Sequence, residues 1–250
     1  MRTNNSPPSI PSGNSNGTDR RSRCPRCWQP QFSCFCEAFQ PQHLPFQLLV
    51  LIHPIERKRR LASGRLLHAL VEPSICIEGE DFVAHTGLQR LLDDPNLKPY
   101  VLSPGTGSVD LDLLSCDQRR EILHSEDHRR LLLILIDGTW ATARRMLRSP
   151  QLRDLPRLMF TPRQSSRFIV RKQPSPTCLS TLEATAEFIE RFTFAMTENQ
   201  ASGPHQNSNL QDVADRLRSA FARLIQAHLD QDPSMTHTRA KGPEANIEQL

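Results

Sequence analysis

The chain has 250 residues, of which 23% are charged, and a formal net charge of +4. This length suits one large domain or two small ones, and no apolar stretch is long enough to span a membrane. The small positive charge does not itself indicate an anionic partner, but basic residues are clustered, as in ERKRR at residues 56–60. Such clusters attract phosphate groups whatever the net charge.

The first segment in chain order, residues 1–22, is predicted to be a disordered tail. It is rich in Pro, Ser, Asn and Gly, which bury too little surface to offset the entropy lost on folding. It lacks the apolar core of a secretory signal, so we expect a cytoplasmic protein, in which disulfides are rare. The final segment, residues 231–250, carries the same prediction of disorder.

Four cysteines follow in the pattern C-x2-C-x6-C-x-C, within a small module predicted at residues 23–45. The first pair has the offset of a zinc knuckle, and the second pair can complete a tetrahedron of thiolates. Because the module is too short for a core of its own, a metal ion is the natural way to keep it folded. A disulfide cluster and a redox pair are the weaker alternatives. We predict a structural Zn²⁺ site made of Cys24, Cys27, Cys34 and Cys36.

The module also carries aromatic side chains among its cysteines, namely Trp28, Phe32 and Phe35, beside the basic Arg26. Such a combination can hold single-stranded or bent RNA by stacking on its bases. The alternative is that the module only ties the N-terminus to the main domain. The sequence leaves both alternatives open.

The main domain, predicted at residues 46–230, alternates short apolar runs with helical patterns. This order predicts an α/β fold with a mostly parallel sheet. RLLLILID, at residues 130–137, is apolar on both faces, as expected of a central parallel strand. The other strands are predicted at residues 46–53, 98–105, 157–162 and 166–172. Helices are predicted at residues 64–71, 88–94, 141–152, 180–192 and 208–229.

The central strand ends on a carboxylate, Asp137. Ligands of open α/β sheets bind beyond the carboxyl ends of the strands. Gly138 permits a sharp turn, Thr139 can cap the next helix, and Trp140 offers a flat face for stacking. These patterns leave two interpretations open: a ligand site at Asp137, or a carboxylate that caps the helix beside an indole that fills the core.

The sequence DGTW at residues 137–140 resembles the D-x-T-W signature of the DTW-domain family, the tRNA-uridine aminocarboxypropyltransferases. Other motifs occur in the order that this family shows: the cysteine pattern, HPIE at residues 53–56, SPG at 103–105 and LSTLEA at 179–184. One departure is LASGRLL at residues 61–67, where family members often carry a Thr- and Asn-rich stretch. There Ser63 retains one polar side chain.

The resemblance implies that S-adenosylmethionine is the co-substrate and tRNA the partner. Its 3-amino-3-carboxypropyl group would be transferred to N3 of a uridine, with release of methylthioadenosine. The resemblance also implies kinship with the SPOUT-like RNA-modifying enzymes, whose sheet contains a deep trefoil knot. We expect neither membrane association nor an obligate protein partner.

Roles for individual residues follow from the resemblance together with the chemistry. Uridine N3–H is a weak acid, so a carboxylate within hydrogen-bond reach can remove its proton as attack proceeds. Catalytic roles are expected for Asp137, Thr139 and Trp140. Donor binding is expected for Leu102, Ser103, Pro104, Gly105, Gly138, Thr181 and Glu183. Contact with tRNA is expected for His53, Glu56, Arg57, Arg60, Arg65, Arg144, Arg145 and Arg171.

Two other functions fit the same motifs. One is a zinc-containing RNA-binding protein without catalysis, although binding alone needs no carboxylate beside an anionic partner. The other is an S-adenosylmethionine-dependent RNA methyltransferase, which differs only in the donor carbon that it presents to the nucleophile.

Overall fold

The protein is described by a computed structural model, which covers most of the predicted module and main domain. The described residues are 22–31, 34, 36, 39–57, 59, 61–123, 128–170, 174–175, 177–197 and 210–231. Both predicted tails lie almost wholly outside these ranges. So do Phe32, Phe35, Arg60, Arg171 and the side chain of Arg57.

Six parallel strands form one sheet in the order β2-β1-β5-β3-β6-β4. The strands are β1 (Gln42–Ile52), β2 (Val71–Glu78), β3 (Leu97–Leu102), β4 (Val109–Asp110), β5 (Arg130–Asp137) and β6 (Arg157–Met159). Since all run in one direction, their carboxyl ends meet at the same edge of the sheet. This arrangement confirms the predicted α/β fold with a parallel sheet, whereas the trefoil knot stays a prediction.

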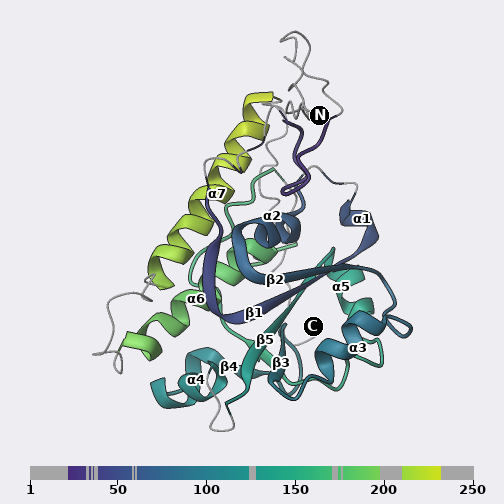
Figure 1. Cartoon of the computed structure of the whole chain (residues 1–250). Helices are drawn as coiled ribbons and strands as arrows, with labels where there is room; N and C mark the ends of the chain where they lie inside the picture. Colours follow the sequence, from purple (N-terminus) through teal and green to yellow (C-terminus); the bar gives the residue numbers. More distant parts are fainter. Residues whose placement is uncertain are drawn as a thin grey trace, which may run out of the picture.

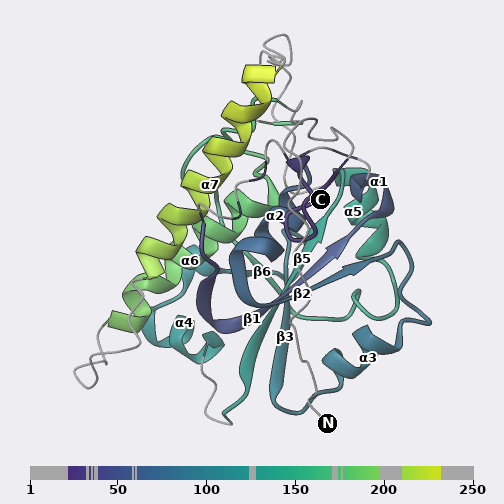
Figure 2. The same ribbon diagram turned by 45° about the horizontal axis from the view of Figure 1, so that its top comes forward.

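Helices cover both faces of the sheet (Figures 1 and 2). They are α1 (Pro54–Arg57), α2 (Ser63–Leu70), α3 (Thr86–Leu92), α4 (Cys116–Leu123), α5 (Trp140–Met146), α6 (Thr181–Thr197) and α7 (Leu210–Gln231). The long helix α7, yellow in Figure 1, packs along α6. None of the helices in the described ranges combines the length and apolarity needed to cross a lipid bilayer.

The central strand β5 divides its side chains between two cores. Leu131, Leu133 and Leu135 pack in the cluster that includes residues of α2, α6 and α7. Leu132 and Ile134 pack in the cluster that includes residues of α3 and α5. All five are at most 2% exposed, so β5 is apolar on both faces, as its sequence predicts.

Two predicted elements differ in the structure. Residues 166–170 do not form a strand, although Phe168 and Val170 are buried and Arg167 and Ile169 are exposed in alternation. Arg167 N–H donates to the side chain of Glu183 instead of to a neighbouring strand. The helix predicted at 141–152 ends at Met146, shortly before a proline at position 150, which disfavours helical backbone in the residue before it.

A buried polar network ties α6 to the segment that follows β6. Arg191 is 0% exposed. It donates hydrogen bonds to Asp112 at 2.7 and 3.3 Å, to Glu187 Oε2 at 3.1 Å and to the carbonyl oxygen of Thr161 at 2.6 Å. Its guanidinium also lies 4.0 Å from the ring centroid of Phe160. These contacts fix the position of α6, whose first turn reaches Asp137.

Arg191→Ala is expected to lower the free energy of unfolding by about 3–5 kcal/mol, because the buried carboxylate of Glu187 would lose its cation. Urea unfolding followed by circular dichroism measures this change. The matched control is Arg153→Ala, which breaks an ion pair with Asp154 whose side chains are 61% and 80% exposed. The control should change stability by less than about 0.5 kcal/mol. Similar losses in both variants would show that the buried network is no stronger than a surface pair.

Candidate functional site

The carboxylate of Asp137 lies where β5 meets the first turns of α2 and α6. Its Oδ1 accepts hydrogen bonds from Ser63 Oγ at 3.2 Å and from Thr181 Oγ1 at 2.6 Å. Asp137 is 3% exposed. Two hydroxyl groups from elements far apart in the sequence therefore hold this carboxylate in one orientation at the carboxyl edge of the sheet.

Gly64, in the first turn of α2, allows the helix to approach Asp137 closely. A Cβ atom built on Gly64 would lie 2.8 Å from Cβ and Cγ of Asp137 and 2.9 Å from its Oδ2. Real Cβ contacts are not this short, so any side chain at position 64 would displace either the helix or the carboxylate. Gly64 was not predicted as a site residue, and Ser63 was noted only as a polar side chain retained where residues 61–67 depart from the family pattern. That departure is their only signal in the sequence.

Gly64→Ala is expected to destabilise the protein by about 1–3 kcal/mol, because the new methyl group overpacks the buried carboxylate. This result would reverse the usual effect of the substitution, since alanine is favoured over glycine within helices by about 1 kcal/mol. Thermal unfolding measures the change. Gly87→Ala, in α3, is the control: its Cβ would lie 3.1 Å from a ring atom of His85, the N-cap of α3, so it should cost less than the shorter contacts of 2.8 Å with Asp137. Equal stability of the two variants would contradict the close packing at Asp137.

The residues after Asp137 begin α5. Thr139 is the N-cap, and its Oγ1 accepts a hydrogen bond from Thr142 N at 3.2 Å. The cap of this helix is thus Thr139 and not Asp137. Burial raises the pKa of Cys178. A backbone hydrogen bond from Ser175 and a hydrogen bond from the Trp140 side chain partly offset this rise. Trp140 itself is partly buried at the start of α5.

The turn after β3 lies at the same sheet edge, because β3 pairs directly with β5. Leu102 ends the strand, and Ser103 N–H donates to the carbonyl oxygen of Leu158 at 2.9 Å. Ser108 Oγ closes the turn by donating to the carbonyl oxygen of Ser103 at 3.1 Å. A Cβ atom on Gly105 would lie 2.9 Å from Arg157 Nη1. Contact of residues 102–105 with the donor stays a prediction.

Glu183, in the first turn of α6, completes the predicted capping box with Ser180. Its Oε2 accepts hydrogen bonds from Ser180 N at 2.9 Å and from Ser180 Oγ at 2.8 Å. The same carboxylate accepts hydrogen bonds from Ser166 Oγ at 2.8 Å and Arg167 N at 2.6 Å. These four bonds give Glu183 a structural task that holds segment 166–168 against α6. The contact of Glu183 with the donor stays a prediction.

His53 follows β1 beside Asp137, and its backbone N–H donates to the Asp137 carbonyl oxygen at 2.9 Å. Its Nδ1 accepts a hydrogen bond from Ile55 N at 3.2 Å. Burial lowers the pKa of His53, and the nearby Arg145 cation lowers it further. Glu80, for which the sequence predicts no role, lies 3.6 Å from His53 Nε2 and pairs with Arg145. His53 is thus one member, with Arg145 and Glu80, of a polar cluster at the edge.

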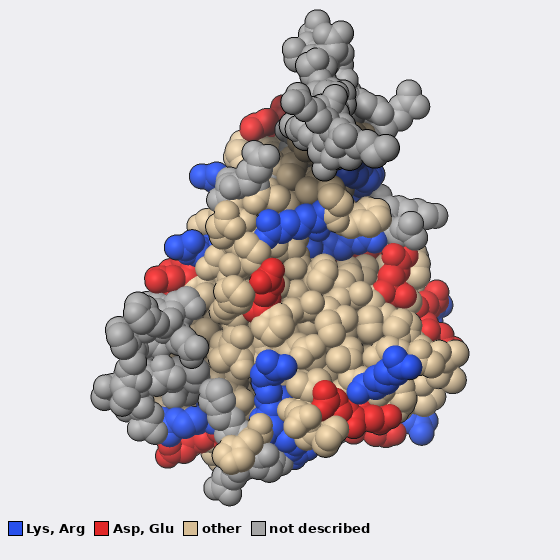
Figure 3. Space-filling model, in the orientation of Figure 1, with Lys and Arg blue, Asp and Glu red and all other residues tan. Residues whose placement is uncertain are grey.

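The predicted tRNA contacts differ in their surroundings. Arg144 is exposed on α5, and so is Arg145. Glu56 is 1% exposed and lies 3.4 Å from Arg59 Nε. Arg65 is 9% exposed and bonds to Glu78. Figure 3 shows basic side chains in a band across the upper part of one face, above a broad area of mostly uncharged residues.

The four predicted cysteine ligands come together. Their sulfur atoms all lie within 4.8 Å of one another, and the pairs Cys24–Cys36 and Cys27–Cys34 are both separated by 3.8 Å. A tetrahedral zinc site with bonds of roughly 2.3 Å places its sulfur atoms about 3.8 Å apart. Burial raises the pKa of Cys24, but backbone N–H groups of Cys27 and Arg26 outweigh it and lower this pKa to about 7. Burial raises the pKa of Cys27, and it raises that of Cys36 to about 11. The support for a metal site is thus the spacing of the four sulfur atoms. The donor set therefore fits a metal ion that binds thiolates.

Comparisons with known proteins agree with these motifs. The sequence model of one family, described as the DTW domain, matches residues 21–229. The chain is 35% identical over 179 residues to tRNA-uridine aminocarboxypropyltransferase 2 of Drosophila melanogaster. This alignment covers 68% of the chain and 66% of the relative. The chain is 29% identical over 173 residues to the Mus musculus protein of the same name, which covers 67% and 55%. The chain thus spans between about half and two thirds of the length of these relatives. No solved structure matches it significantly.

Proposed function

Because this chain belongs to the DTW-domain family, we propose that it is an S-adenosylmethionine-dependent tRNA-uridine aminocarboxypropyltransferase. The observation that carries the proposal is the Asp137 carboxylate, buried at the carboxyl edge of a parallel sheet and oriented by Ser63 and Thr181. That edge is where open α/β sheets bind ligands. The matched relatives bear the same activity in their names.

The co-substrate supplies an electrophilic sulfonium, whose three attached carbons are all open to attack. The protein selects among them by position, because only the carbon aligned with the nucleophile reacts. The turn at residues 103–105, Gly138 and the first turn of α6 surround the Asp137 edge. We assign the binding of the donor to these three elements. They would direct the reacting carbon of its amino-acid arm at the uridine.

Asp137 is assigned as the base that removes the proton from uridine N3. The N–H bond breaks, the freed electron pair forms the N3–carbon bond, and the electrons of the sulfonium–carbon bond leave with methylthioadenosine. Thr181 and Ser63 keep the carboxylate oriented throughout. N3 lies on the Watson–Crick edge, so the uridine must be unpaired or turned out of the tRNA structure. Trp140 offers a ring for stacking at the same end of β5.

The exposed Arg144 and Arg145, together with Arg57, Arg60 and Arg171, are assigned to phosphate groups of the tRNA. Affinity that rests on phosphate contacts falls steeply as the salt concentration rises. Zinc is assigned to the four cysteines as a structural ion. A cytoplasmic location remains part of the proposal.

Mass spectrometry of nucleosides tests the proposal. Unmodified tRNA is incubated with the protein and S-adenosylmethionine, digested, and compared with a reaction that lacks the donor. A uridine heavier by one aminocarboxypropyl group is the expected product. A methyl gain would assign the protein to the RNA methyltransferases, and no gain with retained tRNA binding would make it a binding protein.

A further inference from the structure

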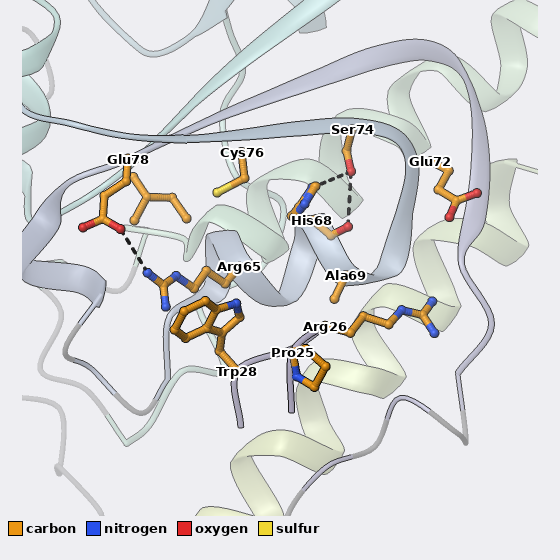
Figure 4. A pocket seen from close by; sticks show the side chains of 11 residues that line it. Pro25, Arg26, Trp28, Arg65, His68, Ala69, Glu72, Ser74, Cys76 and Glu78 are labelled. Atoms are coloured by element: carbon orange, nitrogen blue, oxygen red, sulfur yellow. Dashed lines mark hydrogen bonds and ion pairs between the residues drawn. The ribbon is translucent and has the colours of Figure 1, made fainter. Parts of the chain in front are cut away.

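A pocket of about 490 Å³ lies between the cysteine module, α2 and the edge strand β2 (Figure 4). Its walls combine an exposed indole with cations, carboxylates and neutral polar groups. The residues that give it this character are Arg26, Trp28, Arg65, His68, Ser74 and Glu78. None of them belongs to the site assigned above, although the sequence predicts a tRNA contact for Arg65.

Trp28 adopts a backbone conformation that is unfavourable for its side chain. Its φ is 60°, in the left-handed region, which costs a residue with a side chain roughly 1–2 kcal/mol. Glycine would adopt this conformation without that cost. The turn carries tryptophan instead, with 42% of its surface exposed. Backbone strain that supports an exposed ring indicates a function for the ring.

Arg65 holds the indole from one side. Its guanidinium carbon lies 4.6 Å from the Trp28 ring centroid, and its Nη2 lies 3.4 Å from Glu78 Oε2. Figure 4 shows the guanidinium between the indole and the Glu78 carboxylate. With only 10% of its side chain exposed, Arg65 is fixed before any ligand arrives. Trp28 and Arg65 thus form a preorganised platform for a flat ring.

The charges of the pocket favour a base over a phosphate as its occupant. The carboxylates of Glu72 and Glu78 line it together with the cations of Arg26 and Arg65, so the pocket has no excess of positive charge for a phosphate, and its carboxylates can accept N–H groups from the edge of a base. His68 and Ser74 add a neutral hydrogen-bonded pair, 2.9 Å apart. Partial burial lowers the pKa of His68.

The pocket adjoins the proposed transfer site. Ile52 lines the pocket and lies opposite Asp137 in the β1–β5 register. Burial raises the pKa of Cys76, another lining residue, to about 11; the Arg65 cation lowers it, and the carboxylates of Asp137 and Glu78 raise it. The pocket therefore reaches β1 at a residue paired with Asp137, although Asp137 itself does not line it, and it extends past α2 to the cysteine module.

We propose that an unpaired nucleobase of the tRNA, near the target uridine, enters this pocket and stacks on Trp28. The inference rests on the proposed function, which supplies the RNA. It gives the cysteine module a task in recognition: the metal fixes the turn that presents the indole. Arg26 brings a positive charge to the module side of the pocket, and its buried Nη2 has no hydrogen-bond acceptor among the described residues.

Binding of a short RNA tests the platform without the donor. The first probe is a fluorescein-labelled single strand of about five nucleotides. The control probe is the same labelled sugar-phosphate chain without bases. Trp28→Gly removes the ring and suits the left-handed backbone, so the module should stay folded with its zinc. Trp28→Phe keeps a ring and is the matched control. Fluorescence anisotropy gives the affinities of both variants and of the unaltered protein for each of the two probes.

Trp28→Gly should weaken binding of the base-bearing probe about 5- to 100-fold, the usual range for one base stacked on an aromatic ring. Its affinity for the abasic chain should stay within about two-fold of the unaltered protein, and Trp28→Phe should stay near the unaltered protein on both probes. Unchanged affinity of Trp28→Gly for the base-bearing probe, or equal loss on both probes, would overturn the inference. A base-dependent loss in a protein that transfers nothing to tRNA would instead overturn the proposed function.

Discussion

Asp137→Asn should reduce transfer to tRNA by about 10²- to 10⁴-fold, the range attributable to a positioned general base. Asparagine keeps the size of the side chain and an oxygen that can accept the bonds from Ser63 and Thr181. The neutral amide, however, cannot take the proton from uridine N3. Single-turnover transfer at saturating donor and tRNA measures the chemical step.

Two controls separate a base from a merely structural carboxylate. Binding of donor and tRNA by Asp137→Asn should be close to that of the unaltered protein, as measured by calorimetry. Ser63→Ala removes one orienting hydroxyl group but retains the carboxylate, and should reduce transfer far less than Asp137→Asn does. Turnover of Asp137→Asn within a few-fold of the unaltered protein would remove Asp137 from its assigned role.

Replacing Cys24 and Cys27 together by serine is expected to release the metal and unfold the module. Both thiols are buried, at 7% and 1% exposure, and both pack against Ala69 of α2. Two hydroxyl groups cannot replace two thiolates, and metal binding is a main source of stability for so short a segment. Zinc per chain, measured by plasma emission spectrometry, should fall from about one to near zero.

Cys116→Ser serves as the control, because this cysteine lies in α4, outside the cluster of four. Its zinc content should equal that of the unaltered protein. An unchanged zinc content in the double variant would refute the site. Loss of the metal should also remove the stacking on Trp28, whose φ and position depend on the turn between the first two cysteines.

The sheet was predictable where burial determines the sequence pattern. β5 is apolar on both faces because helices cover both, and its predicted and observed bounds coincide at Arg130–Asp137. β2 was not predicted, because it is an edge strand that contains a proline and three polar or charged positions. Proline is tolerated at such an edge, but it argues against a strand when the sequence is the only guide.

The site was predictable only in part, for a similar physical reason. The position of Asp137 at the end of an apolar run marks a ligand edge without any coordinates. Its partners Ser63 and Thr181 are 74 and 44 residues away along the chain, and only the folded arrangement brings them together. Segment 166–170 could not be assigned from the sequence for the same reason. Its side chains alternate between buried and exposed as in a strand, but Arg167 N–H donates to Glu183 and not to a neighbouring strand.

The most direct test of the central claim uses two preparations of S-adenosylmethionine, one radiolabelled in the carboxyl group and the other in the methyl group. If the protein directs the amino-acid arm of the donor at uridine, tRNA will acquire label from the carboxyl-labelled preparation alone. Label that enters tRNA from the methyl-labelled preparation, or from neither while tRNA stays bound, would contradict the account.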